Sequence, residues 1–199
     1  VSTTYWHHTY DGTELLRVRE TRVTYNSDGS ERYSTTILVY YGANQGNSSG
    51  LLKFKVDPEG VNRFLAANPT VKGVDPSYVG NFYDEVDNPN EDKCDLDDLT
   101  TVTDAALEDY ASVIHDSYDE DGRIVQQSAG VNCSSCGGGG DYGITVYEYV
   151  DNENYAPADA TEVHNTWKSA IRIKWCKLDG DNLVEVGPRR VKFFNGMEQ

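Results

Sequence analysis

The chain has 199 residues, of which 38% are hydrophobic and 11% are aromatic, enough for one domain or two small ones with a buried core. Its 33 Asp and Glu residues outnumber 17 Lys and Arg residues, giving a formal net charge of −16 at pH 7. This charge repels phosphate backbones and anionic lipid headgroups, and so argues against nucleic-acid and membrane-surface binding. The longest wholly apolar run, Ile37–Tyr41, is far shorter than the roughly 20 residues that span a bilayer, so we expect no membrane insertion.

The first methionine is Met197, which predicts removal of a leader or larger precursor unless Val1 is read from an alternative start codon. The number of cysteines is even, as is typical of proteins from oxidising compartments. Together these features predict an extracellular or cell-surface location.

Alternation of apolar and polar residues with a period of two recurs along the chain and predicts β-strands. It is clearest late in the sequence, where the odd positions of 167–176 are mainly apolar and the even positions mainly polar. The predicted strands are Ser2–Trp6, Leu15–Tyr25, Tyr33–Tyr41, Leu52–Val56, Gly143–Val150, Trp167–Cys176 and Val191–Phe194. The run 183–186 is too short to assign.

Between these strands lie residues that favour tight hairpin turns, because Asp, Asn and Gly tolerate positive φ. The predicted turns are Asp11-Gly12, Asn26–Gly29, Asp121-Gly122 and Asp179-Gly180. Successive hairpins pair locally, so we expect a mostly β fold: antiparallel hairpins in a meander sheet or a sandwich, with two short helices packed on it.

The first helix is predicted from Val61, Phe64 and Leu65, which lie at i, i+3 and i+4, and it ends at Asn68-Pro69. The second begins after the capping residue Thr103. Its predicted apolar stripe consists of Leu107, Tyr110, Ala111 and Ile114.

An acidic segment, 84–98, contains eight Asp or Glu among fifteen residues. It divides the chain into a predicted N-terminal hairpin lobe (1–83) and a C-terminal lobe (99–199), or else it is a loop within one continuous domain. No cofactor is expected apart from calcium, for which this segment offers oxygen ligands. A solvated loop is favoured over a calcium site, because Lys93 and Leu99 stand where an EF-hand needs Gly and Glu. The candidate ligands are Asp87, Asn88, Asn90, Asp92, Asp95 and Asp97.

Cys133 and Cys136 can close a disulfide, bind zinc together with Cys94 and Cys176, or act as a redox pair. A redox role needs a helix N-terminus, and none is predicted there. Zinc needs a second close pair, whereas Cys94 and Cys176 are 82 residues apart. Disulfides are therefore favoured. Three connectivities are possible, and the working hypothesis is Cys133–Cys136 with Cys94–Cys176.

The segment Tyr118–Ile124, with sequence YDEDGRI, resembles the YD signature of bacterial Rhs/YD-repeat proteins, in which Tyr-Asp is followed by Gly-Arg and an aliphatic residue. Tyr25–Gly29 and Asp57–Arg63 look similar. The run from Asp109 to Gly137 also resembles stretches of some long Rhs-type surface proteins in which a hairpin leads into a Cys-x-x-Cys-Gly turn. The resemblance implies a secreted or surface-displayed β-sheet shell. The turn glycines are unevenly spaced, so no regular solenoid is expected.

No catalytic residue is predicted. Gly46–Gly50 matches G-x-S-x-G, but strands are expected on both sides, as at a hairpin tip. Gly138, Gly140 and Gly143 match G-x-G-x-x-G, but a strand follows where a helix is needed. The spacing of His7, His8, His115 and His164 fits no metal motif, so solvated or packed histidines are expected.

These patterns predict a non-enzymatic extracellular structural or cell-surface β protein that associates with itself or with other surface proteins into filaments or layers. The alternative is a β module that binds a carbohydrate or another ligand through an exposed tryptophan. The candidate contact residues for either role are Trp6, Trp167, Trp175, Phe193 and Phe194.

Overall fold

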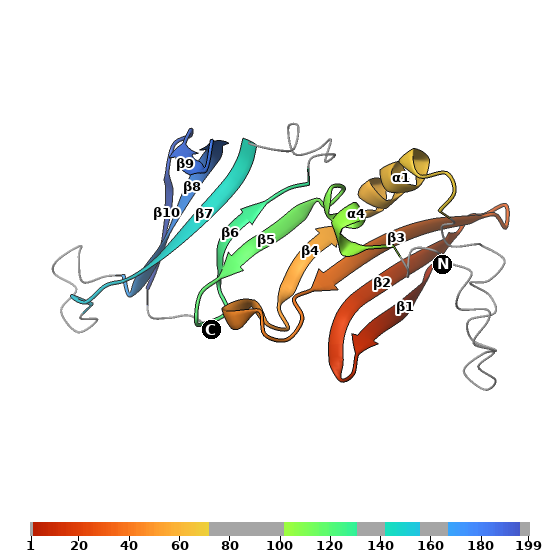
Figure 1. Cartoon of the computed structure of the whole chain (residues 1–199), viewed down its shortest axis with the longest axis horizontal. Coiled ribbons are helices and arrows are strands. Elements are labelled where there is room, and N and C mark those ends of the chain that lie inside the picture. Colours follow the sequence, from red (N-terminus) through yellow and green to blue (C-terminus); the bar gives the residue numbers. More distant parts are fainter. Residues whose placement is uncertain (1, 72–101, 131–141, 156–166, 196–199) are drawn as a thin grey trace.

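In the computed structural model, residues 2–71, 102–130, 142–155 and 167–195 are described. They form one open, antiparallel, ten-stranded sheet in the order β1-β2-β3-β4-β5-β6-β7-β8-β10, with β9 also paired to β8 (Figure 1). The predicted fold class is confirmed, and of the two predicted arrangements these strands adopt the meander.

Most strands that are consecutive in the chain pair with each other in the sheet, and the connection from β4 to β5 contains both described α-helices. The bounds of the elements are β1 Ser2–Asp11, β2 Glu14–Tyr25, β3 Glu31–Tyr40, the 3-10 turn η1 Gly46–Ser48, β4 Leu52–Val56, α1 Pro58–Ala67, α4 Asp104–Glu108, β5 Val113–Tyr118, β6 Ile124–Ser128, β7 Tyr142–Asp151, β8 Ser169–Asp179, β9 Asn182–Glu185 and β10 Arg190–Phe194.

The four predicted turns each connect two paired strands, and their glycines have positive φ. Gly12 (φ 59°) joins β1 to β2, and Gly122 (φ 74°) joins β5 to β6. L-amino acids rarely adopt this conformation, so glycine is what allows such short turns. The turn chemistry read from the sequence therefore determines four of the hairpins in the meander.

Helix α1 confirms the first predicted helix. The side chain of Asp57 caps it by accepting a hydrogen bond from Gly60 N (2.8 Å), and Pro58 occupies the first turn, where no backbone donor is needed. Asn68 ends it. Asp57–Arg63, which looks similar to a YD segment in the sequence, thus forms the start of a helix.

The main core lies beneath α1 and α4, which cover the sheet over β3 and β4 (Figure 1). Each strand contributes alternate residues to it, as the period-two pattern requires. Its buried members are Ile37, Val39, Phe54, Val56, Val61, Phe64, Leu107 and Ala111.

Two arginines, Arg17 and Arg19, are buried on β2, which the hydrophobic pattern alone did not predict. Arg17 donates to the carbonyl oxygen of Val102 (2.8 Å) and pairs with the Asp104 carboxylate at the start of α4. This ion pair attaches α4 to a strand more than 80 residues away in sequence.

The prediction for the second helix is correct only at its beginning. Thr103 accepts a hydrogen bond from Ala106 N (3.4 Å), but α4 ends at Glu108. Tyr110 and Ala111 lie in the connection after α4, and Ile114 belongs to strand β5, which pairs with β4 and β6. The apolar positions fitted a helical stripe, but pairing with two neighbouring strands outweighs that local preference.

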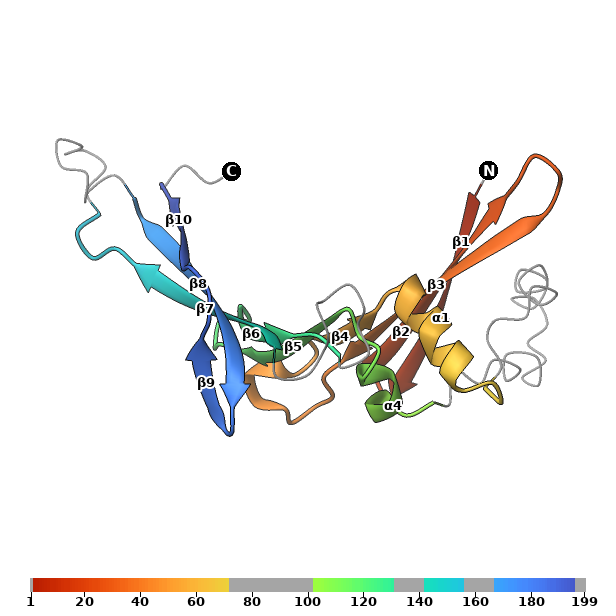
Figure 2. The same ribbon diagram turned by 90° about the horizontal axis from the view of Figure 1, so that it is seen from above.

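The sheet is continuous across the predicted boundary between the two lobes. Phe54 and Lys55 of β4 pair with Ile114 and Val113 of β5. Figure 2 shows that the sheet is strongly twisted and bent, with β1–β3 at one end and β7–β10 at the other. The acidic segment 84–98 lies outside the described residues.

Candidate functional site

An exposed aromatic row follows the first edge of the sheet. Trp6, His8 and Tyr10 occupy alternate positions on β1 and therefore share one face. Trp6 is 55% exposed and Tyr10 57%, and the rings of His8 and Tyr10 stack at 6.2 Å. Trp6 was among the predicted contact residues, whereas His8 and Tyr10 were not.

This row lies on the face opposite the helices. Trp6 pairs with Glu20 and His8 pairs with Val18, so the row shares the face of β2 that carries Glu20 and Val18. The side chain of Arg17 lies on the other face of β2, where it reaches α4. Among the described strands β1 pairs with β2 alone. The row therefore has an unpaired strand edge beside it and no described helix above it.

The other four predicted contact residues gather at the opposite end of the sheet. Phe193 on β10 is 61% exposed and packs edge-on against Trp167 (5.3 Å between ring centroids). The guanidinium of Arg190 lies 5.0 Å from the centroid of Trp175, a cation–π contact. Trp167, Trp175 and Phe194 are half-buried.

The segment 167–195, which contains β8, β9 and β10, is basic in a chain that is acidic as a whole. Residues 167–195 contain seven Lys or Arg and three Asp or Glu, a net charge of +4. In contrast, residues 102–130 contain seven acidic residues and one basic residue, a net charge of −6. These two regions therefore have opposite charge.

A network of tyrosines and one histidine connects the middle strands. Tyr118 Oη donates to the carbonyl oxygen of Leu52 (2.5 Å) and so accepts from His115 Nδ1 (2.7 Å). Tyr41 Oη donates to His115 O (2.7 Å). Burial lowers the pKa of His115, consistent with a neutral, packed ring, and burial raises the pKa of Asp116.

Tyr118 provides a test of this network. Burial, with a smaller contribution from Tyr41, raises the pKa of Tyr118 to about 12, so the folded state holds its phenolic proton more strongly than the unfolded state. The resulting stability is fully present below about pH 10 and is lost as the pH rises towards 12. We expect Tyr118→Phe to cost about 1 kcal/mol at pH 7, because the Leu52 carbonyl and His115 lose a partner.

Urea unfolding of the wild type and of Tyr118→Phe at neutral and alkaline pH measures both effects. The variant is expected to lose less stability than the wild type between pH 10 and 12, the interval over which Tyr118 ionises. Equal loss in the two proteins would show that Tyr118 is not the titrating group.

The hairpin that contains the YD-like segment is held by local ion pairs. Arg123 Nε donates to Asp119 Oδ2 (2.7 Å), and its Nη2 lies 2.9 Å from Asp121 Oδ2. The Arg123 guanidinium also lies 4.4 Å from the centroid of Tyr149. These contacts hold the turn between β5 and β6, and the resemblance to Rhs/YD-repeat proteins stays a prediction.

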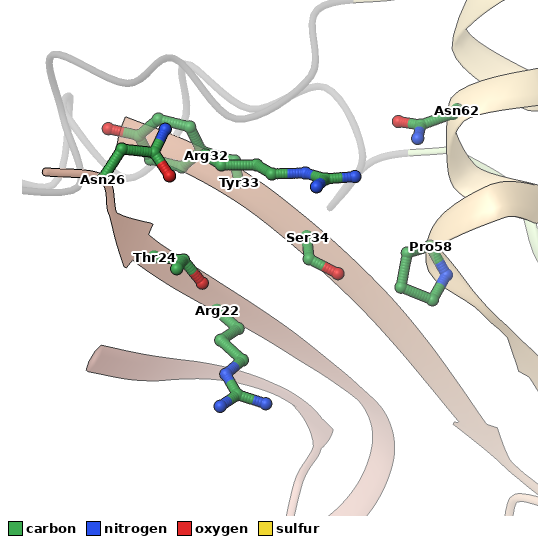
Figure 3. A pocket seen from close by; sticks show the side chains of 8 residues that line it. All are labelled: Arg22, Thr24, Asn26, Arg32, Tyr33, Ser34, Pro58 and Asn62. Atoms are coloured by element: carbon green, nitrogen blue, oxygen red, sulfur yellow. The ribbon is translucent and has the colours of Figure 1, made fainter. Parts of the chain in front are cut away.

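A pocket of about 380 Å³ lies between the β2–β3 hairpin and α1 (Figure 3). Arg32 extends from β3 towards Asn62, whereas Arg22 points towards β1, where its Nη2 lies 3.3 Å from Ser2 Oγ. The lining is mostly polar: Arg22, Thr24, Asn26, Arg32, Tyr33, Ser34, Pro58 and Asn62. Its two guanidinium groups point in different directions, so they do not converge on one anion.

The cysteine prediction needs one correction. Cys176 is a free, buried thiol on β8, so the predicted Cys94–Cys176 disulfide is not formed. Burial raises its pKa, which keeps the thiol protonated. The pairing was inferred from the even number of cysteines, which carries no information on distance. Cys94, Cys133 and Cys136 lie outside the described residues, as do the six calcium candidates.

The sequence motifs with enzyme-like patterns adopt simple loop or strand geometry where they are described. Gly46–Gly50 forms the tip between β3 and β4, as predicted, and Ser49 Oγ accepts from Gln45 N (3.0 Å). Gly143 lies in β7, while Gly138, Gly140 and His164 lie outside the described residues. In the described part of the chain, no three His, Cys, Asp or Glu residues form a group that suits a metal ion.

No family model, curated protein or solved structure matches this chain. None of the helices in the described ranges is both long and apolar enough to cross a membrane. The two ends of the described sheet, where the exposed aromatic side chains lie, are the candidate functional surfaces.

Proposed function

We propose that this chain is a non-enzymatic structural β protein of the cell exterior or cell surface, which associates with itself or with other surface proteins into filaments or layers. The observation that carries the proposal is an open sheet whose two outermost described strands both bear exposed aromatic side chains. Trp6 and Tyr10 lie at one end, and Phe193 lies at the other.

Sheet edges support association because each unpaired strand presents backbone donors and acceptors along one side. A strand of another molecule can bond to them directly, and the side chains beside the edge add contact area. Among the described strands, the open meander has such an edge at both ends, whereas a closed barrel has none.

The uneven distribution of charge along the chain supports contact between copies in one orientation. The basic region 167–195 of one molecule is attracted by the acidic region 102–130 of another, and this attraction offsets part of the repulsion between two chains of net charge −16. Salt screens exposed charges, so association through these regions is expected to weaken as ionic strength rises.

Light scattering after size exclusion, over a wide range of protein concentration and at low and high salt, tests the proposal. We expect species larger than the monomer that grow with concentration, with filaments or layers visible by negative-stain microscopy. Compact monomers under all these conditions would contradict it. Detection of the natural protein in the medium or on the cell surface tests the location.

Exposed aromatic residues support a second candidate, a carbohydrate-binding module. Trp6 and Tyr10 share one face of β1 and can stack on sugar rings. This function predicts binding on a glycan array that is lost in Trp6→Ala and retained in Phe193→Ala, which is changed at the other end of the sheet. Equal binding by both variants would contradict a glycan site at β1.

A further inference from the structure

The two edges of the sheet differ in a way that indicates which one is available for pairing. Natural proteins protect edge strands against unwanted partners by keeping them short and by placing proline, lysine or other charged residues on them. Residues of this kind are concentrated at one end of the described sheet and nearly absent from the other.

The β9–β10 edge carries all of these protective features. The outer side of β8 is covered by two short strands, β10 opposite Ser169–Ile173 and β9 opposite Cys176–Asp179. Pro188 lies between them, and β10 itself contains Arg190 and Lys192. A strand from another molecule that approached this edge would meet two short strands, an interruption at Pro188 and the positive charges of β10.

The β1 edge lacks these features. It is ten residues long, contains neither proline nor lysine nor arginine, and has Asp11 at its end as its one acidic residue. Its pairing with β2 is regular from Ser2 to Thr9, with one register shift between Thr9 and Tyr10. Beside this edge stand the exposed rings of Trp6 and Tyr10.

We propose that two copies of this chain pair through their β1 strands, antiparallel and about a two-fold axis, to form one continuous sheet. This inference rests on the proposed self-association and names its surface. The pair is the unit from which filaments or layers would grow through other surfaces.

The charges of the two edges favour a second copy at β1 over a second copy at β10. Two β10 strands facing each other bring Arg190 and Lys192 against the same cations of the other molecule, and like charges opposite each other are destabilising. Two β1 strands facing each other place only uncharged residues opposite one another over Ser2–Tyr10. A two-fold contact is also the commonest symmetry among oligomers of identical chains.

Strand geometry restricts how the two β1 strands align. Residues directly opposite each other in an antiparallel pair share one face of the sheet. Full overlap of Ser2–Tyr10 with its own copy satisfies this condition and places Trp6 opposite Trp6 and His8 opposite Thr4. The helices of both copies then lie on the same face of the joined sheet.

The test compares matched pairs of lysine substitutions at the two edges by sedimentation velocity of the full chain. Trp6→Lys combined with His8→Lys puts new positive charge beside the two-fold axis, and we expect the dimer dissociation constant to rise by about tenfold or more. Val191→Lys combined with Phe193→Lys makes the same kind of change at exposed β10 positions and is expected to leave the dimer intact.

Cross-linking provides a readout that does not depend on the lysine variant folding. Trp6→Cys should give a disulfide between the two copies of position 6, identified by peptide mass spectrometry, whereas Phe193→Cys should give none. A linkage from position 6 to a residue outside β1 overturns the inference. The inference is also overturned if the Trp6→Lys/His8→Lys variant is folded, as judged by circular dichroism, and still associates as strongly as the wild type. The proposed function then survives. A wild type that stays monomeric overturns both.

Discussion

Phe54→Ala is expected to lower the free energy of unfolding by about 3–5 kcal/mol. Phe54 is fully buried on β4, opposite Val39 of β3 and Ile114 of β5. Truncation removes the aromatic ring from the cluster beneath α1 and α4, and the rigid sheet on one side limits how far the cavity collapses. This is the largest stability loss that we expect from a single substitution.

Urea denaturation measures the loss, and Phe193→Ala is the matched control. Phe193 is 61% exposed, so its truncation is expected to change stability by no more than about 0.5 kcal/mol. Similar losses in the two variants would contradict a core centred on β3, β4 and the helices.

Gly130→Ala is expected to destabilise the protein by about 1–3 kcal/mol, the cost of forcing extra volume into a tight contact. A Cβ atom at Gly130 would lie 2.4 Å from the carbonyl oxygen of Glu108 and 2.5 Å from that of Asp109. Both are backbone atoms at the end of α4, so they cannot move aside by a side-chain rotation. Gly130 N also donates to Ala111 O (3.0 Å), which holds the two segments together.

Gly42→Ala is the control for this experiment. A Cβ at Gly42 meets Leu16 Cδ2 at 3.7 Å, an ordinary contact with a flexible side chain, so we expect a much smaller change. Thermal and urea unfolding of the two variants give the comparison. A Gly130→Ala protein as stable as Gly42→Ala would show that the end of α4 does not approach the residues after β6 so closely.

Two features of the sequence determined most of the fold. Alternating apolar and polar residues identified β2, β3, β4, β7, β8, β10 and the first half of β1. The Asp-Gly and Asn-containing turns predicted the hairpins β1–β2, β2–β3, β5–β6 and β8–β9. Both signals are local, because side-chain alternation and positive φ depend on a few neighbouring residues. Helix α1 was also predicted from a local signal, the i, i+3, i+4 spacing of Val61, Phe64 and Leu65, with its end at Asn68.

Tertiary structure decided what depends on distant partners. Ile114 belongs to β5 and not to a helix because β4 and β6 pair on both sides of it, and Arg17 is buried because α4 supplies Asp104. Cys176 is a free thiol although the number of cysteines is even. Likewise, the sequence singled out Trp6, but only the order of strands shows that it lies beside an edge without proline or basic residues. Edge position is a property of the whole sheet, so no local pattern contains it.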